Sequence, residues 1–258
     1  MKFVRLLVTV VVLVNLAACG SWNKKDETYG WSAQRIYGEA KESLDSGDYE
    51  RAIKFYEILE AKFPFERFAQ QAQLDMMYAY YKFEEPESAI ATAERFIKLY
   101  PRHANLDYVY YLKGLVNFER DQGIISRYLP IDRSQRDQGA AVDSFRDFAE
   151  LIKRYPESKY AQDTRERMVF LRNNLAEYEL HVARYYMKRG AYVAAANRAK
   201  YVIESYQKTP AVPEALAIMA KAYKVLGLND LSNSALRVLK LNYPNHQRIA
   251  EVESVTLQ

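Results

Sequence analysis

The stretch "YERAIKFYEILEAKFP", residues 49–64, places apolar side chains at intervals of three and four residues and stops at a proline. Such intervals put the apolar side chains on one face of an α-helix. Proline cannot continue the helix, because it has no backbone N–H and its ring collides with the preceding turn. The stretch therefore predicts an amphipathic helix that ends at Phe63-Pro64. The same spacing recurs from Ser32 onward with hardly any strand signal, which indicates an all-α protein.

An aromatic residue close before a proline recurs along the chain and marks predicted helix ends. The first two markers are 37 residues apart and the last two are also 37 apart, whereas the middle intervals are 55 and 51 residues. A period near 37 is typical of helix-turn-helix repeats. The markers are Phe63-Pro64, Tyr100-Pro101, Tyr155-Pro156, the looser run "YQKTP" at 206–210 and Tyr243-Pro244.

A small residue stands eleven positions before each aromatic marker. Small side chains at a fixed point on the second helix let the paired helix approach closely, as in tetratricopeptide (TPR) repeats. The first helices of the last two repeats also carry a small residue three positions before a tyrosine, although the first two repeats depart from that companion pattern. The small residues are Ala52, Ala89, Ser144, Ala195 and Ser232.

The sequence thus predicts an all-α fold, a TPR-like α-solenoid of about five helix-turn-helix repeats with an insertion in the third. Helical pairs cannot bury their apolar faces alone, so they stack into a right-handed superhelix with a concave groove. Residues 32–156, with a loop at 121–139, form an N-terminal sub-array, and residues 157–258 form a C-terminal one. The predicted repeats are 32–64, 69–101, 106–156, 176–207 and 212–244.

Two segments of the predicted solenoid have alternative interpretations. A helix at about 160–173 either joins the two sub-arrays or continues into the first helix of repeat four as one long element. The last stretch, "NHQRIAEVESVTLQ" at 245–258, is either a capping helix or a frayed tail.

The N-terminus has the three parts of a secretory signal: positive charges, an apolar core too short to span a bilayer, and small residues before the only cysteine. The run Leu16-Ala17-Ala18-Cys19 resembles the lipobox of bacterial lipoproteins. The alternative is a cysteine that merely lies near an ordinary cleavage site. On the lipobox interpretation, residues 1–18 are removed by cleavage between Ala18 and Cys19.

Cys19 would then carry covalent diacylglycerol and an N-acyl lipid, and several acyl chains make a stable membrane anchor. Gly20 stands where an inner-membrane retention signal would place aspartate, which favours the outer membrane. Residues 19–31 are predicted to be the lipidated cysteine and a flexible tether.

Residues that could support catalysis or bind a metal are scarce. His103, His181 and His246 are isolated from one another and from the cysteine, so we expect no metal site. No nucleophile motif or phosphate-binding glycine loop is present, and we therefore expect a binding protein without a cofactor rather than an enzyme. Against 33 acidic residues, the 37 basic residues give an excess too small to indicate a nucleic-acid partner.

Tyrosine is frequent, with 22 residues. Aromatic residues at helical spacing usually pack in a core, but the repeat register places some of them on the concave face. There they would bind an extended peptide ending in an aromatic residue and a carboxylate, with lysines and Arg67 at the rim supplying charge. The predicted groove residues are Tyr37, Lys41, Leu74, Tyr78, Tyr81, Lys82, Tyr108, Tyr111, Leu115 and Phe118.

Four runs resemble the BamD family, the TPR lipoproteins of the outer-membrane β-barrel assembly (Bam) machine, over nearly the whole mature chain. They are "QLDMMYAYYK" (73–82), "IDRSQRD" (131–137), "RMVFLRNNLAEYELHVARYYMKRGAY" (167–192) and "VAAANR" (193–198).

The resemblance implies a non-enzymatic scaffold on the periplasmic side of the outer membrane of a Gram-negative bacterium. Its implied partners are the POTRA domains of BamA, the lipoproteins BamC and BamE, and unfolded outer-membrane β-barrel proteins. Arg198 falls where the family has a basic residue implicated in contact with BamA, and Lys200 lies beside it. A guanidinium there can form a charge-assisted pair with a partner carboxylate, although it could also be an ordinary exposed arginine.

Two further alternatives concern the insertion and the function. Asp132, Arg133, Arg136 and Asp137 either pair internally, which we favour, or bind an accessory subunit such as BamC. The alternative function is that of a periplasmic TPR lipoprotein that coordinates cell-wall synthesis or polysaccharide export. Only the four runs that resemble the BamD family favour β-barrel assembly over this alternative.

Overall fold

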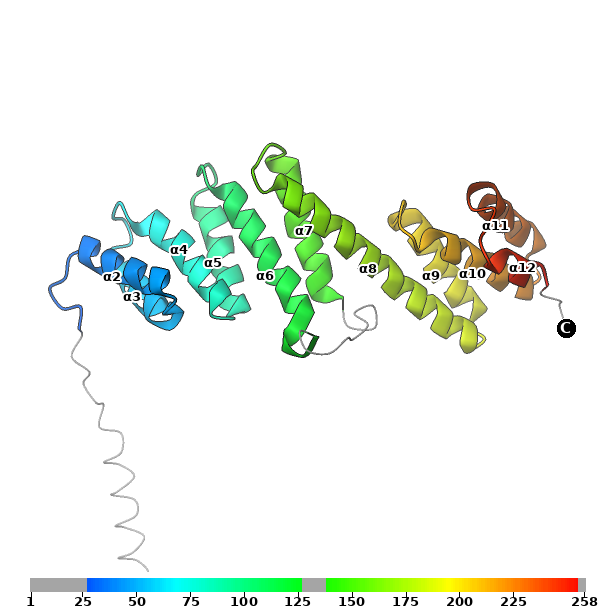
Figure 1. The fold of residues 1–258 in the computed structure, drawn as a ribbon, viewed down its shortest axis with the longest axis horizontal. Helices are drawn as coiled ribbons and strands as arrows, with labels where there is room; N and C mark the ends of the chain where they lie inside the picture. Colours follow the sequence, from blue (N-terminus) through cyan, green and yellow to red (C-terminus); the bar gives the residue numbers. More distant parts are fainter. Residues whose placement is uncertain (1–26, 127–137, 255–258) are drawn as a thin grey trace, which may run out of the picture.

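The computed structural model describes residues 27–126 and 138–254, and within 121–126 only the helical backbone. In these residues the chain forms eleven helices and no strand. Figure 1 shows them following one another along the long axis of an elongated molecule. They are α2 Ala33–Ser46, α3 Tyr49–Lys62, α4 Ala69–Lys82, α5 Pro86–Leu99, α6 Leu106–Ser126, α7 Gly139–Arg154, α8 Ala161–Lys188, α9 Tyr192–Ser205, α10 Val212–Val225, α11 Asn229–Asn242 and α12 Arg248–Glu253.

Each helix packs mainly on the helices that precede and follow it in the chain. The pairs α2–α3, α4–α5, α6–α7, α8–α9 and α10–α11 correspond to the five predicted repeats. The predicted all-α, TPR-like solenoid is therefore confirmed.

The small residues predicted at the helix contacts are all buried. Two of them are serines, and they also use the hydroxyl: Ser144 Oγ donates to the carbonyl of Gly114 at 2.9 Å, and Ser232 Oγ donates to the carbonyl of Ala220 at 2.8 Å. A serine at this position thus permits close packing and adds a hydrogen bond to the paired helix. Exposure is at most 3% for Ala52, Ala89, Ser144, Ala195 and Ser232.

The aromatic markers end the second helix of each repeat. The backbone N–H of each marker donates to the carbonyl four residues earlier, at 2.8 or 2.9 Å, and the chain then leaves the helix. The markers in this position are Phe63, Tyr100, Tyr155, Tyr206 and Tyr243.

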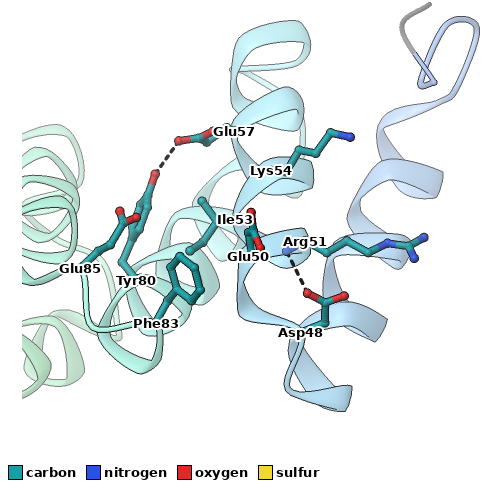
Figure 2. Close-up of a pocket in the computed structure, with 9 residues that line it drawn as sticks. All are labelled: Asp48, Glu50, Arg51, Ile53, Lys54, Glu57, Tyr80, Phe83 and Glu85. Atoms are coloured by element: carbon teal, nitrogen blue, oxygen red, sulfur yellow. Dashed lines mark hydrogen bonds between the residues drawn. The ribbon is translucent and has the colours of Figure 1, made fainter. Parts of the chain in front are cut away.

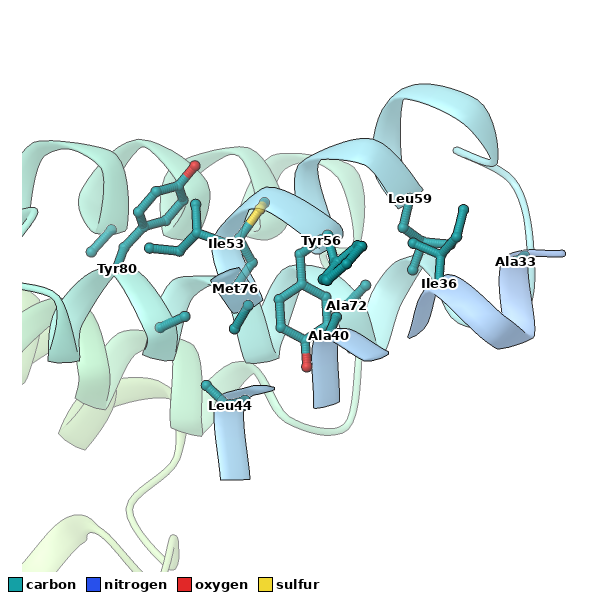
Figure 3. Packing of buried hydrophobic residues seen from close by; sticks show 14 of the residues in the cluster. Ala33, Ile36, Ala40, Leu44, Ile53, Tyr56, Leu59, Ala72, Met76 and Tyr80 are labelled. Carbon is teal, nitrogen blue, oxygen red and sulfur yellow. The ribbon is translucent and has the colours of Figure 1, made fainter. Parts of the chain in front are cut away.

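The first core cluster joins repeats one and two. Figure 3 shows Ile36, Tyr56 and Met76, which come from α2, α3 and α4, in one packed group. Each is at most 2% exposed. Burial of a large apolar side chain stabilises the fold by about 1.5–3 kcal/mol, so this cluster fixes how the first helices of neighbouring repeats lie against one another.

Residues 27–31, the described part of the predicted tether 19–31, lie against the folded repeats. Residues 27–30 form a turn that lies against α3, and Thr28 is only 1% exposed. Lys62 Nζ donates to Thr28 Oγ1 at 2.8 Å, and Trp31 stacks on Phe55 with ring centroids 6.0 Å apart. The prediction was wrong for these residues, because contacts with a helix about 30 positions later, invisible in local composition, hold them in place.

The structure shows where the helices of the third repeat end, and it decides between the alternatives for the helix at 160–173 and for the C-terminal stretch. The first helix of repeat three continues to Ser126, so residues 121–126 are helical rather than part of the predicted loop, and residues 127–137 lie outside the described residues. The helix expected at 160–173 runs on to Lys188 as the single 28-residue helix α8, which is the second of its two alternatives. The C-terminal stretch contains α12, packed on α10 and α11, as expected for a capping helix.

Candidate functional site

A pocket of about 400 Å³ lies across the first helices of the first three repeats. It brings together Lys41, Tyr78 and Tyr108, which were all predicted groove residues. Its other lining residues, not predicted from the sequence, are Leu44, Asp45, Tyr49 and Asp75. The pocket is therefore a mixed aromatic and charged site, with two carboxylates beside one lysine.

Asp75 is the organising side chain of this pocket. Its Oδ2 accepts hydrogen bonds from the phenols of Tyr37 at 2.9 Å and Tyr56 at 3.3 Å, and its Oδ1 accepts from Gln71 at 2.8 Å. Burial, and then the charge of Asp75, raise the pKa of both phenols above the ordinary value for tyrosine. Both phenols therefore stay protonated donors at physiological pH.

Aromatic rings in and beside this pocket lie on α2, α4, α6 and the N-cap of α8, and we call them the tyrosine band. Tyr78 and Tyr81 have ring centroids 6.2 Å apart, and Tyr160 lies 5.9 Å from Tyr108 and stacks on Tyr111 at 4.5 Å. Stacked and tilted rings at these distances attract one another. The tyrosine band consists of Tyr37, Tyr78, Tyr81, Tyr108, Tyr111 and Tyr160.

Carboxylates from neighbouring helices hold the band in position. Tyr81 donates to Glu119 at 2.6 Å, and Tyr111 donates to Asp163 Oδ2 at 2.8 Å. Arg167 Nε donates to the same oxygen of Asp163 at 2.7 Å. Burial and the Asp163 bond raise the pKa of Tyr111 to about 12. Against the opposing effect of burial, the bonds from Arg167 and Tyr111 lower the pKa of Asp163 below its ordinary value.

Two predicted groove residues are core residues instead. Leu74 is 3% exposed and packs with Met77 and Phe96, and Phe118 is 9% exposed and packs with Phe148. The repeat register assigned too many residues to the concave face. Neighbouring residues on a helix point about 100° apart, so a side chain beside a groove position can point into the core. Leu115 is partly buried against the same two clusters.

The predicted cations have different surroundings. Lys41 forms an ion pair with Asp45 one helical turn later. Lys82 is exposed, with Nζ 6.0 Å from the ring centroid of Tyr81, and Arg67 is exposed over the ring of Phe68. The structure adds Arg167, whose guanidinium lies 4.9 Å from the ring centroid of Phe118, as a cation beside the band.

Sequence reasoning missed the carboxylates because their partners lie far along the chain. Asp75 and Tyr37 are 38 positions apart, and Tyr111 and Asp163 are 52 apart. The only local signal for Asp75 was a single acidic residue inside the otherwise apolar and aromatic run 74–81.

Arg198 and Lys200 lie on α9, in the C-terminal half. Arg198 Nη1 donates to Glu179 of α8 at 2.9 Å, and this bond raises the pKa of Arg198. The Arg198 side chain is still 44% exposed, whereas that of Glu179 is 11% exposed. Lys200 pairs at 3.6 Å with Glu204 on the surface. Arg198 is thus oriented by a largely buried carboxylate that the sequence did not reveal.

A larger pocket, of about 610 Å³, lies on α3 and the turn after α4. Figure 2 shows its side chains, in which Tyr80 donates to Glu57 and Asp48 caps the backbone N–H of Arg51. These carboxylates therefore already have donors within the protein. The lining residues are Asp48, Glu50, Arg51, Ile53, Lys54, Glu57, Tyr80, Phe83 and Glu85.

Several predicted features lie outside the described residues, namely Ala18, Cys19 and the loop residues Asp132, Arg133, Arg136 and Asp137. Across 27–126 and 138–254, no helix is long and apolar enough to cross a membrane. In the same ranges no three histidine, cysteine, aspartate or glutamate side chains are grouped as a metal site would require.

The fold and the tyrosine band define a TPR-like repeat protein, a class that presents extended surfaces to other chains. A family model described as outer membrane lipoprotein, YfiO, matches residues 31–239. The outer membrane protein assembly factor BamD of Neisseria gonorrhoeae is 48% identical to the chain over 244 residues, covering 93% of this chain and 91% of that protein. The chain belongs to the BamD family of outer-membrane lipoproteins.

More distant relatives bear the same name. The assembly factor of Vibrio cholerae is 39% identical and covers 81% of this chain and 86% of its own length. That of Xylella fastidiosa, strain Temecula1, is 35% identical and covers 93% of this chain and 82% of its own length.

Proposed function

We propose that this chain is a lipid-anchored, non-enzymatic scaffold on which outer-membrane β-barrel proteins are assembled. The observation that carries the proposal is a tyrosine-lined surface across three repeats, in a chain whose relatives are named outer membrane protein assembly factors. Cys19 holds the scaffold at the periplasmic face of the outer membrane. BamA, through its POTRA domains, and the lipoproteins BamC and BamE are its partners in the Bam complex.

The tyrosine band binds extended segments of unfolded barrel proteins. Barrel strands alternate apolar and polar side chains, so one face of such a segment can lie on rings while its backbone remains free to pair. Tyrosine suits this task, since a ring gives large contact area at a low cost in conformational entropy. The phenols of Tyr37, Tyr81 and Tyr111 are already held by carboxylates, so the band is preorganised.

The test replaces Tyr78, which is 37% exposed in the pocket, and Tyr111 by alanine. Loss of both rings should weaken binding of a peptide from the last strand of a barrel protein about tenfold or more, as expected for buried aromatic contacts. Fluorescence anisotropy with a labelled peptide measures the affinity.

The matched control is Tyr185→Ala, which removes an exposed tyrosine near the end of α8, outside the band. Unchanged affinity in the Tyr78 and Tyr111 variants, with normal helical circular dichroism, would refute peptide binding by the band. A peptide with an amidated C-terminus tests the predicted carboxylate recognition separately, because only that interaction is removed.

A further inference from the structure

The two most exposed large apolar side chains of the described residues lie at one corner of the molecule. Phe65 is 99% exposed and Tyr29 is 88% exposed, and the next, Leu241, is 75% exposed and belongs to the last repeat. Single exposed apolar residues are normal on a protein surface. Two almost fully exposed aromatic rings at the same corner need a specific explanation.

Contacts between the N-terminal turn and α3 bring the two segments that carry these rings close to one another. Lys62 Nζ donates to Thr28 Oγ1 at 2.8 Å and approaches the Thr28 carbonyl at 3.4 Å. Tyr29 follows Thr28 directly, and Phe65 follows Lys62 by three positions, a span of at most about 11 Å between Cα atoms. Figure 3 shows the start of α2 at Ala33 beside the end of α3 at Leu59.

Exposed cations lie in the same segments as the two rings. Arg35, Lys62 and Arg67 are exposed, and the guanidinium of Arg35 lies 3.9 Å from the ring centroid of Trp31. Among the described residues of these segments, the acidic side chains are Glu27, which pairs with Lys54 at 3.5 Å, and Glu66. Aromatic rings next to cations are typical of protein surfaces that meet phospholipid headgroups. We call the surface formed by Tyr29, Arg35, Lys62, Phe65 and Arg67 the anchor corner.

The position of the anchor corner in the chain identifies its occupant. Glu27 comes eight positions after Cys19, and eight residues span at most about 29 Å even when fully extended. A lipid on Cys19 therefore keeps the anchor corner within that distance of the bilayer, whereas the last repeat lies at the opposite end of an elongated molecule (Figure 1).

We propose that the anchor corner contacts the phospholipid surface, so that the first repeat docks on the membrane through Tyr29 and Phe65. The inference rests on the lipid attachment at Cys19 that forms part of the proposed function. It adds a second, non-covalent contact that fixes which end of the solenoid meets the bilayer. Without that contact, the lipid anchor alone would leave the orientation of the repeats undetermined.

The experiment places an environment-sensitive NBD dye at single introduced cysteines. Because Cys19 is the only cysteine and its thiol is consumed by the lipid, an introduced cysteine is the only free thiol. Full-length lipidated Phe65→Cys and Tyr29→Cys chains are labelled and reconstituted into vesicles of phosphatidylethanolamine and phosphatidylglycerol. Leu241→Cys is the matched control, because it is also a highly exposed apolar position.

We expect blue-shifted emission and at least twofold quenching by doxyl-labelled lipids at positions 29 and 65, and neither change at 241. Arg67→Glu should reduce the quenching at position 65 when phosphatidylglycerol is present. If the dye at positions 29 and 65 has the same emission maximum as the dye at 241, as expected in water, the proposal is overturned. Shielding that arises only after BamA is added would also overturn it, in favour of a protein partner.

Vesicle flotation and the mass of the N-terminal peptide test the anchor itself. A chain that lacks the lipid and fails to float refutes the lipid attachment, and with it the basis of the inference. A chain that floats with its lipid but leaves the dye in water refutes only the anchor corner. Both labelled positions are almost fully exposed, so the substitutions leave the core unchanged, which circular dichroism verifies.

Discussion

Gly114 of α6 is a residue whose lack of a side chain determines helix packing. A Cβ at this position would lie 2.4 Å from the ring of Phe148, a fully buried residue of α7. No real Cβ contact is so short, and the ring cannot withdraw from a packed core without displacing its neighbours. The glycine therefore sets how closely the two helices of the third repeat approach.

We predict that Gly114→Ala lowers the free energy of unfolding by about 1–3 kcal/mol, the usual result of overpacking a core. The effect opposes the higher helix propensity of alanine, which favours the variant by about 1 kcal/mol in an open helix. Gly38→Ala is the matched control, because no atom lies within 4 Å of a Cβ there, and it should be neutral or stabilising. Urea denaturation measures both, and equal stabilities would contradict the packing argument.

Arg198 illustrates how an internal partner can prepare a residue for an external one. If it contacts a carboxylate of BamA, Arg198→Glu should weaken co-purification with the POTRA domains by about tenfold or more, since it puts two carboxylates together at the contact. Glu179→Gln should weaken binding much less, because Arg198 then keeps its charge and loses only the internal ion pair that orients it. Pull-downs at several salt concentrations measure the binding of both variants. Unchanged binding of the Arg198→Glu variant would show that Arg198 is not part of the interface with BamA.

Individual residues show which features could be predicted from the sequence and which could not. Proline, glycine and small residues act on their immediate neighbours, so helix ends and contact points could be predicted from local patterns. The bond from Tyr37 to Asp75 depends on two helices that meet only after folding. The same is true of Arg198 and Glu179, 19 positions apart, so the partners inside the site could not be predicted.

Among the helices, α12 is short and depends on ion pairs for its position. Glu214 of α10 accepts two hydrogen bonds from Arg184, each 2.8 Å, and pairs with Arg248 of α12 at 2.8 Å. Glu251 of α12 pairs with Lys221 at 2.6 Å. The bond from Arg184 lowers the pKa of Glu214, and the bond from Lys221 lowers that of Glu251. Charged carboxylates therefore hold α12 on α10.

Carboxyls with lowered pKa values contribute stability at neutral pH and lose it as the pH falls through their folded-state pKa. We predict that the protection factors of the α12 amides, the ratios of intrinsic to observed exchange rate, fall strongly below about pH 4.5, the ordinary range of a glutamate. Glu214→Gln should show low protection factors already at pH 7 and a smaller change on acidification. Equal protection factors at pH 7 and pH 3 would show that apolar contacts alone, such as those of Val252, hold α12.

At the scale of the whole molecule, α8 connects the two halves. Leu171 and Leu175, near its middle, belong to a cluster with α6 and α7, whereas Leu180 and Ala183, further toward its C-terminus, belong to a cluster with α9 and α10. A helix of 28 residues is about 42 Å long. Figure 1 shows α8 running from α7 to α9, so repeat three and repeat four are built on one rigid rod.

We predict that Asn173→Pro, in the middle of α8, separates the two halves thermodynamically. Proline inside a helix costs about 3 kcal/mol or more. Asn173 lies between Leu171 and Leu175, just before α8 passes from the first cluster to the second, and besides α8 the two clusters have Tyr206 in common. Calorimetry should then show two unfolding transitions instead of one, while Asn173→Ala keeps a single transition. A single cooperative transition in the proline variant would mean that the halves communicate through other contacts.

The turn at residues 27–30, fixed against α3 by the bond between Lys62 and Thr28, has a kinetic consequence. It fixes Glu27 on the first repeat, so the proposed lipid on Cys19 would hold this end of the solenoid within roughly 3 nm of the membrane surface, the reach of the eight residues that precede Glu27. Short flexible connections generate effective concentrations in the millimolar range. A membrane-embedded partner would therefore meet this chain at a local concentration far above that of a freely diffusing periplasmic protein, and weak individual contacts would suffice to keep the assembly together.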